Sequence, residues 1–194
     1  MIINILLVVG VIVVFWVVAN YNFFVSSKAR VKAAVQEIGN QLKRQADLIP
    51  NLEASVKGYL SHEKAIFTQL SEARRAIAGA LKSGDVQKMA DAGSKLASVL
   101  PNISVAVESN PEIKGSEVVG KLMDELRDTA DKVMYARRLV IDLTVDYNIK
   151  RVTFPSSLVA TLFKFVELPG LITPEGGEHV EVNESEMKSP KVNL

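Results

Sequence analysis

His62 and Glu63 are the residues that come closest to a metalloenzyme motif. A zinc-protease helix carries two histidines one turn apart, so that both face the metal, with a glutamate beside the first. Here the position one turn after His62 is Ile66, and the other histidine, His179, lies far along the chain. The sequence has no cysteine, which excludes thiol catalysis and thiolate metal sites. We therefore predict no metal site and no cofactor, and interpret His62 as a helix-surface residue or one that hydrogen-bonds a neighbouring helix.

Four polar residues, Lys43, Arg44, Asp47 and Asn51, surround Pro50. Together they could form a polar docking site for a partner protein or a lipid headgroup. The other interpretation, which we favour, is that Asp47 or Asn51 caps free N–H groups at a helix break, while Lys43 and Arg44 lie in solvent.

Arg137 lies close to the apolar stripe of an expected long helix near the C-terminus. A lone arginine in a helical bundle usually pairs with an acid, and Glu63 and Asp47 are candidates by residue type alone. Such a pair would fix the register of two helices more than it would add stability. Tyr147 and Asn148, near the end of the same helix, are expected to anchor its last turns against the first helix.

No combination of acid, base and nucleophile in the sequence indicates catalysis. Asp124 and Glu125 are adjacent on an expected helix and point to different faces, and no glycine-rich phosphate loop is present. The formal net charge of +1 indicates no general attraction to nucleic acid. We therefore predict a protein that is not an enzyme and that acts by binding an unidentified protein partner.

The chain begins with an uncharged apolar stretch, residues 2–19, in which Asn4 is the only strongly polar side chain. As a helix this stretch spans roughly 27 Å, close to the hydrocarbon thickness of a bilayer. A cleaved signal peptide would begin with basic residues, and none precedes Lys28. A buried core helix would normally keep a solvated, charged face. We therefore predict an uncleaved transmembrane anchor at residues 1–20.

Basic residues follow this stretch directly. Lys28, Arg30 and Lys32 precede the first acidic residue, Glu37. Because basic residues beside a span favour the cytoplasmic side of the membrane, we expect the rest of the chain to lie in the cytoplasm.

About 170 residues remain, enough for one domain with its own core. Apolar residues at alternating spacings of three and four predict helices over residues 20–49, 51–82, 86–99 and 116–152. Pro50 is expected to separate the first two helices, although one continuous, kinked helix stays open as the alternative.

Turn signals divide the rest of the chain. Residues 83–85, Ser-Gly-Asp, predict a helix end followed by a cap, and Pro101 is expected to close or kink the next helix. Residues 101–117 are interpreted as helical or irregular, because a single strand would have no partner. A short apolar helix over residues 158–166 would either close the open end of the bundle or lie against the membrane surface. The acidic segment 169–194 is expected to be disordered.

The order of residues between positions 41 and 63 resembles the signature of the LemA family. It consists of Gln41-Leu42-Lys43-Arg44-Gln45-Ala46-Asp47-Leu48-Ile49-Pro50-Asn51-Leu52, then Val56-Lys57-Gly58-Tyr59 and His62-Glu63. Further matches follow in order: Tyr21-Asn22, Ala73-Arg74, Leu122 to Leu126, Ala136-Arg137-Arg138, Tyr147-Asn148 and Phe154-Pro155. The resemblance extends over residues 1–168.

The resemblance implies a bacterial, single-pass inner-membrane protein with a soluble antiparallel helical bundle, and it supplies no reaction. The full prediction is an all-α chain with an anchor at residues 1–20, a LemA-like bundle of about four helices at residues 21–168, and a tail at residues 169–194. We interpret the protein as a scaffold or assembly factor that acts through protein–protein contacts. A homo-oligomeric protein that remodels membranes or forms a shell is the alternative.

Overall fold

The computed structural model of the chain describes residues 1–57 and 64–172. All regular structure in these two ranges is helical, which confirms the predicted all-α fold. Four long helices and two short ones follow one another: α1 (Ile2–Val56), α2 (Lys64–Ser83), α3 (Val86–Ser109), α4 (Pro111–Lys114), α5 (Glu117–Val152) and α6 (Ser156–Leu162).

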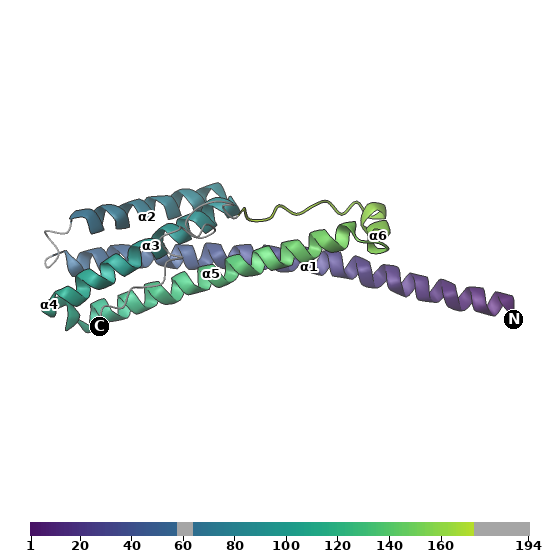
Figure 1. Cartoon of the computed structure of the whole chain (residues 1–194), viewed down its shortest axis with the longest axis horizontal. Helices are drawn as coiled ribbons and strands as arrows, with labels where there is room; N and C mark the ends of the chain where they lie inside the picture. Colours follow the sequence, from purple (N-terminus) through teal and green to yellow (C-terminus); the bar gives the residue numbers. More distant parts are fainter. Residues whose placement is uncertain (58–63, 173–194) are drawn as a thin grey trace, which may run out of the picture.

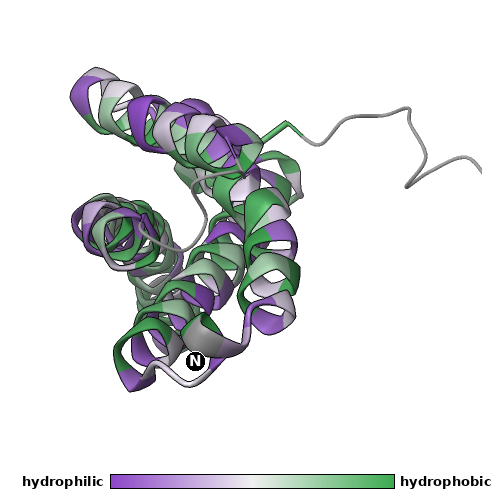
Figure 2. Cartoon of the chain, turned by 90° about the vertical axis from the view of Figure 1, so that its left-hand side faces the viewer, coloured by the Kyte–Doolittle hydropathy of each residue, from purple (hydrophilic) through white to green (hydrophobic). Residues whose placement is uncertain are grey.

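The four long helices form an elongated bundle, and the first part of α1 extends beyond it (Figure 1). Helix α1 packs along α5 and also contacts α2 and α3, while α3 lies against both α2 and α5. Seen end-on, the helices of the bundle carry both hydrophobic and hydrophilic residues (Figure 2). The hydrophobic sides build one continuous core, with fully buried residues from every long helix, such as Leu42, Leu70, Leu96 and Leu126.

Helix α1 is continuous over 55 residues and passes through Pro50. The predicted start of a new helix at Pro50 is therefore wrong, and the alternative of one continuous helix is confirmed. A proline inside a helix removes one hydrogen bond and costs about 3 kcal/mol. Burial outweighs this cost, because Ile49, Leu52 and Val56 are completely buried on the core-facing side. Helix α1 ends after Val56, and α2 begins at Lys64.

Pro101 likewise does not end α3, so of the two expectations, that it would close or kink the helix, the first is wrong. The helix continues to Ser109, and Ile103 beyond the proline is fully buried. The helical interpretation of residues 101–117 is confirmed over α3 and the short helix α4. Helix α3 ends where the N–H of Asn110 donates to the carbonyl of Val107, directly before Pro111.

The predicted turn at residues 83–85 is confirmed. Gly84 adopts φ +67°, a left-handed conformation that ends α2 at little steric cost only for glycine. Asp85 then caps α3, since its carboxylate accepts a hydrogen bond from the Lys88 N–H at 3.1 Å. Ser116 caps α5 in the same way through the N–H of Val119.

Gly93, in the middle of α3, allows three helices to approach one another closely. A Cβ atom built on Gly93 would lie 2.6 Å from Val133 Cγ1 on α5 and 3.5 Å from Leu42 Cδ2 on α1. The first distance is shorter than van der Waals contact allows. The missing side chain therefore sets how closely α3 approaches α5.

The short helix expected over residues 158–166 begins earlier and ends earlier. Helix α6 covers Ser156–Leu162, and the chain then leaves the helical conformation at Lys164, which has φ +55°. Of the predicted tail, residues 169–172 are described and carry no regular structure, and the rest lies outside the described residues.

The first part of α1 differs from every other part of the bundle in its surroundings. An 18-residue window of this helix has a mean hydropathy of 3.0, and none of the window is buried within the protein. The apolar residues from Ile2 to Phe15 are all at least half exposed. By length and composition this segment is a candidate membrane span.

Candidate functional site

The polar residues around Pro50 lie on the outer side of α1. Lys43, Asp47 and Asn51 are spaced four residues apart and are all exposed, so they form a polar stripe along the helix. Because the helix continues through Pro50, it offers no free N–H groups here for Asp47 or Asn51 to cap. The capping interpretation is therefore wrong, and the stripe is a solvated helix face.

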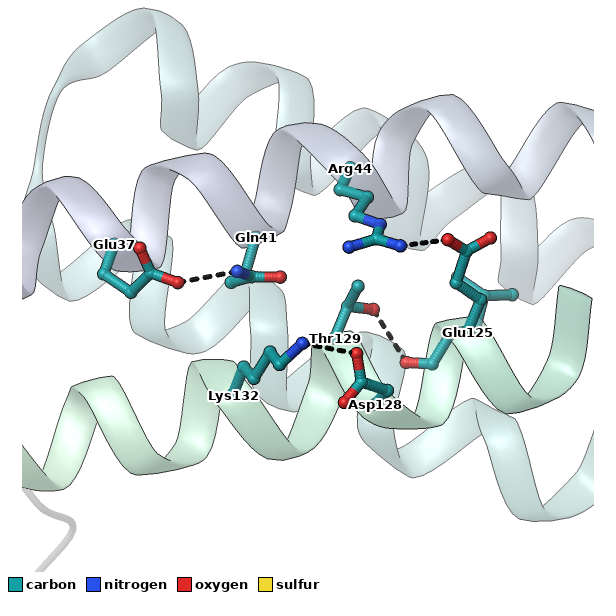
Figure 3. A network of polar contacts seen from close by, with 8 residues as sticks. Glu37, Gln41, Arg44, Glu125, Asp128, Thr129 and Lys132 are labelled. Carbon is teal, nitrogen blue, oxygen red and sulfur yellow. Dashed lines mark hydrogen bonds and ion pairs between the residues drawn. The ribbon is translucent and has the colours of Figure 1, made fainter.

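Arg44 is the member of this group that reaches another helix (Figure 3). Its guanidinium donates a hydrogen bond to the Glu125 carboxylate on α5, and this contact raises the pKa of Arg44. Intrahelical pairs flank it, with Gln41 donating to Glu37 at 2.6 Å and Lys132 to Asp128 at 2.6 Å. Both side chains of the Arg44–Glu125 pair are more than a third exposed, so the network orients α1 against α5 and adds little stability.

Gln45 interrupts the apolar stripe of α1 and is completely buried. Its side-chain nitrogen and oxygen make no hydrogen bond with any described residue. A buried amide without a hydrogen-bond partner is costly, typically by about 1–3 kcal/mol. Gln45 is therefore expected to lower the stability of the core.

Arg137 connects α5 to α3 without an acid. Its Nη1 donates to the Ser94 hydroxyl at 3.0 Å, and no described carboxylate lies within ion-pair distance. The predicted partner Asp47 is exposed on α1, and the other candidate, Glu63, lies outside the described residues. A hydroxyl satisfies Arg137 at this half-exposed position because solvent reaches the remaining guanidinium donors. The predicted pairing with Asp47 is therefore wrong.

A shallow groove runs between α3 and α5 beside Arg137 and Arg138. It was not predicted from the sequence. One part has a volume of about 600 Å³, and the adjoining part measures about 310 Å³. Two apolar side chains beside the groove are well exposed, Val105 at 63% and Met134 at 59%. We call this surface the α3–α5 groove, defined by its apolar lining residues Ala97, Leu100, Pro101, Val105, Ala130, Met134 and Ile141.

Tyr147 anchors the end of α5 against the first helix as expected, whereas Asn148 bonds to the chain beyond α6. The fully buried Tyr147 packs edge-to-face on Phe24 of α1, with ring centroids 5.4 Å apart. Its hydroxyl donates to the Val166 carbonyl at 2.9 Å, and burial raises its pKa. Asn148 makes two hydrogen bonds to the backbone of Leu168, donating at 2.9 Å and accepting at 3.0 Å.

The phenylalanines around Tyr147 were not singled out from the sequence. Phe24 is completely buried, and Phe165 stacks on it at 4.8 Å between ring centroids. Phe24 lies shortly after the apolar stretch, where aromatic residues are common at a membrane interface, and this signal could have identified it. Phe165 follows α6 and carries no such signal. The aromatic cluster of Phe24, Tyr147 and Phe165 joins α1, α5 and the segment after α6. It lies at the end of the bundle nearest the candidate span.

Metal-ligating side chains do not gather anywhere in residues 1–57 and 64–172, where no group of three His, Cys, Asp or Glu could hold an ion. His62, Glu63 and His179 lie outside these ranges. The prediction that they form no metal site stays a prediction.

Comparison with known proteins assigns the chain to a family. None of the curated proteins matches this sequence. A family model of the LemA family matches residues 34–193, which is well over half of the chain. This match includes α1 from residue 34 and all the later helices, and it agrees with the residue order between positions 41 and 63. The chain belongs to the LemA family.

Proposed function

We propose that this protein is a single-pass scaffold or assembly factor of the bacterial inner membrane, with its helical bundle in the cytoplasm. The observation that carries the proposal is the double environment of α1. Its apolar window has no protein around it, whereas the rest of the same continuous helix forms the centre of the bundle core. A lipid environment for the window removes the exposure of its apolar side chains to water.

The continuous helix supports a positioning role. Because α1 runs from the window into the core without a break, the direction of the bundle relative to the span is set by the helix itself. A flexible linker would leave the bundle free to reorient. A domain held at a fixed direction presents the same surface to every neighbour, which is what a scaffold requires.

The cytoplasmic orientation is supported by the basic residues beyond the window. Lys28, Arg30 and Lys32 are all exposed on α1 and are followed by the first acidic residue, Glu37. Basic residues this close to a span favour the cytoplasmic side.

Extraction with alkaline carbonate tests the anchor. We expect the full chain to stay in the membrane pellet and a Val11→Lys/Val14→Lys variant to move to the supernatant, since each lysine near the centre of a span costs about 2.5–3.5 kcal/mol. The matched control is Val105→Lys/Val118→Lys, which places the same charges on exposed valines of the bundle and should stay in the pellet. Carbonate release of the unsubstituted chain would contradict the anchor.

Cysteine labelling tests the orientation, because the chain contains no cysteine of its own. A Val118→Cys variant should react with a membrane-impermeant maleimide only after spheroplasts are permeabilised. Labelling in intact spheroplasts would place the bundle outside the cytoplasm.

The scaffold role itself is tested by photo-crosslinking from the α3–α5 groove. A benzophenone amino acid at Val105 should give one defined adduct with another protein in membranes, and the same group at Val118, equally exposed but outside the groove, should not. An adduct of twice the chain's mass would favour the homo-oligomeric alternative. Equal, diffuse labelling from both positions would contradict a specific partner surface.

A further inference from the structure

Helix α6 carries an apolar side that the bundle does not cover. Val159 and Ala160 are buried against the rest of the protein, each at 2% exposure. Leu158 and Leu162, four residues apart and therefore on one side of the helix, are 60% and 72% exposed. Phe154, just before the helix, is 77% exposed. The two leucines therefore give α6 an exposed apolar side.

Aromatic contacts tie α6 to a defined level of α1. Phe163, at the end of α6, packs edge-to-face on Tyr21, with ring centroids 4.9 Å apart. Phe165 lies 5.6 Å from Tyr21 and 4.8 Å from Phe24. Figure 1 shows α6 at the end of the bundle where the N-terminal part of α1 leaves it. The level of α6 along α1 is therefore that of Tyr21 to Phe24.

This level coincides with the edge of the candidate span. The apolar stretch ends at Ala19, so Tyr21 is about 3 Å and Phe24 about 7–8 Å beyond it along the helix axis. The polar headgroup layer on each side of a bilayer is about 5–8 Å thick. If residues 2–19 occupy the hydrocarbon core with α1 near the membrane normal, α6 therefore lies at the level of this layer.

The charges at the same level suit lipid phosphates. Lys164 is exposed next to Phe163, and Lys150 lies over the Phe23 ring with its Nζ 4.0 Å from the centroid. Neither lysine forms an ion pair with a described residue, whereas the neighbouring Arg151 pairs with Glu167 at 2.8 Å. Apolar side chains with lysines beside them are the pattern of interfacial helices.

We propose that the exposed side of α6, made of Phe154, Leu158 and Leu162, lies in the interfacial layer of the bilayer, with Lys150 and Lys164 at the level of the lipid phosphates. This inference rests on the membrane anchor proposed above and goes beyond it. The bundle contacts the membrane at two points, the span and α6. The second contact fixes its rotation about the span axis and therefore which face of the bundle points along the membrane.

Depth measurements by electron paramagnetic resonance test this contact. The full chain is reconstituted into nanodiscs of phosphatidylcholine and phosphatidylglycerol, with one nitroxide on a single introduced cysteine. Test positions are Leu158→Cys and Leu162→Cys, the matched aqueous control is Val105→Cys at a similar exposure of 63%, and the lipid control is Val9→Cys in the span. Each variant must keep the thermal unfolding transition of the unsubstituted chain, as expected for exposed positions.

We expect the ratio of oxygen to water-soluble nickel accessibility at positions 158 and 162 to be several-fold higher than at position 105 and lower than at position 9. A water-like ratio at both test positions with a lipid-like ratio at position 9 overturns the α6 contact and leaves the anchor standing. A water-like ratio at position 9 overturns both. Labels at the test positions that are shielded from both reagents and broadened by a second label place another copy of the chain on α6, which also overturns the proposal.

Discussion

The two parts of α1 have the same secondary structure and opposite surroundings. Leu7, in the first part, is 65% exposed, whereas Leu42, in the second, is completely buried. In the first part apolar residues occupy the whole circumference of the helix, and in the second they are confined to a stripe. A helix that is apolar all round needs an apolar solvent, whereas a striped helix needs other helices.

This difference shows that one helix can belong to two environments without a break in its backbone. Hydrogen bonds within a helix are satisfied locally, so the backbone is indifferent to whether lipid or protein surrounds it. The side chains alone decide where the change occurs. It falls near Asn20 and Phe24, the first buried residues of α1.

The largest expected loss of stability tests the contrast between Leu42 and Leu7. Leu42→Ala should lower the free energy of unfolding of the bundle by about 2–5 kcal/mol, because it leaves a cavity in the core. Leu7→Ala, the same substitution on the same helix, should leave bundle stability unchanged. Chemical denaturation of both variants in detergent, followed by circular dichroism, measures the difference. Equal losses would mean that the first part of α1 also packs on the bundle.

A second comparison concerns two helical glycines. Gly93→Ala should destabilise the bundle by about 1–3 kcal/mol, because its Cβ would overlap Val133 Cγ1. Gly79→Ala on α2, where a Cβ meets nothing within 4 Å, should stabilise it by up to about 1 kcal/mol. Adding Val133→Ala to Gly93→Ala should recover part of the loss. If no such coupling appears in this double-mutant cycle, the close approach of α3 and α5 is not the cause.

The third comparison asks whether the core-facing side of α1, like its apolar N-terminal part, is more stable with an apolar side chain at every position. Gln45 is the position that tests this. Gln45→Met keeps the shape of the side chain and removes a buried amide without a hydrogen-bond partner. We expect the free energy of unfolding to rise by about 1–2 kcal/mol. The control is Gln36→Met, an exposed position on the same helix, which should change little. A loss of stability at position 45 would show that the amide is satisfied in solution.

The smallest expected change in stability concerns Tyr147, at the end of the bundle beside the candidate span. Burial raises the pKa of Tyr147, so the unfolded chain loses this proton at a lower pH than the folded chain does. The folded chain therefore binds more protons above about pH 10, and its stability falls as the pH rises through this range.

The measurement for Tyr147 is the melting temperature of the unsubstituted chain and of Tyr147→Phe between pH 8 and pH 11. At pH 8 the variant should be about 0.5–1.5 kcal/mol less stable, because it lacks the hydrogen bond to Val166. The difference should shrink as the pH rises above 10. Parallel curves for the two proteins would contradict a buried phenol.

Most of the fold follows from local patterns in the sequence. The stripes of α2 and α5 and the caps at Asp85 and Ser116 could be predicted, because spacing and capping are properties of a few neighbouring residues. The C-terminal ends of α1 and α3 could not be predicted in this way. Pro50 and Pro101 are strong local stop signals, and only the burial of the residues beyond them, Leu52 and Ile103, shows why the helices continue.

The candidate sites divide in the same way. Tyr147 was correctly expected to anchor the end of α5 against the first helix, where it packs on Phe24. Asn148 was expected to do the same, and its hydrogen bonds instead go to the backbone of Leu168. Asp47 was wrongly expected as a partner of Arg137, which donates to the Ser94 hydroxyl. Residue type limits what can pair with an arginine, but the neighbouring side chain is set by helix order and register, which no local pattern contains.

By itself, the sequence determined an apolar opening stretch and four striped helices, because composition and periodicity are local properties that every fold must satisfy. The residue order between positions 41 and 63 added the resemblance to the LemA family. Only the tertiary structure decided that one helix carries both the candidate span and the centre of the core, that α3 and α5 leave a groove between them, and that α6 lies level with the end of the span. These features depend on contacts between residues far apart in the chain, and packing rather than local preference determines their energy.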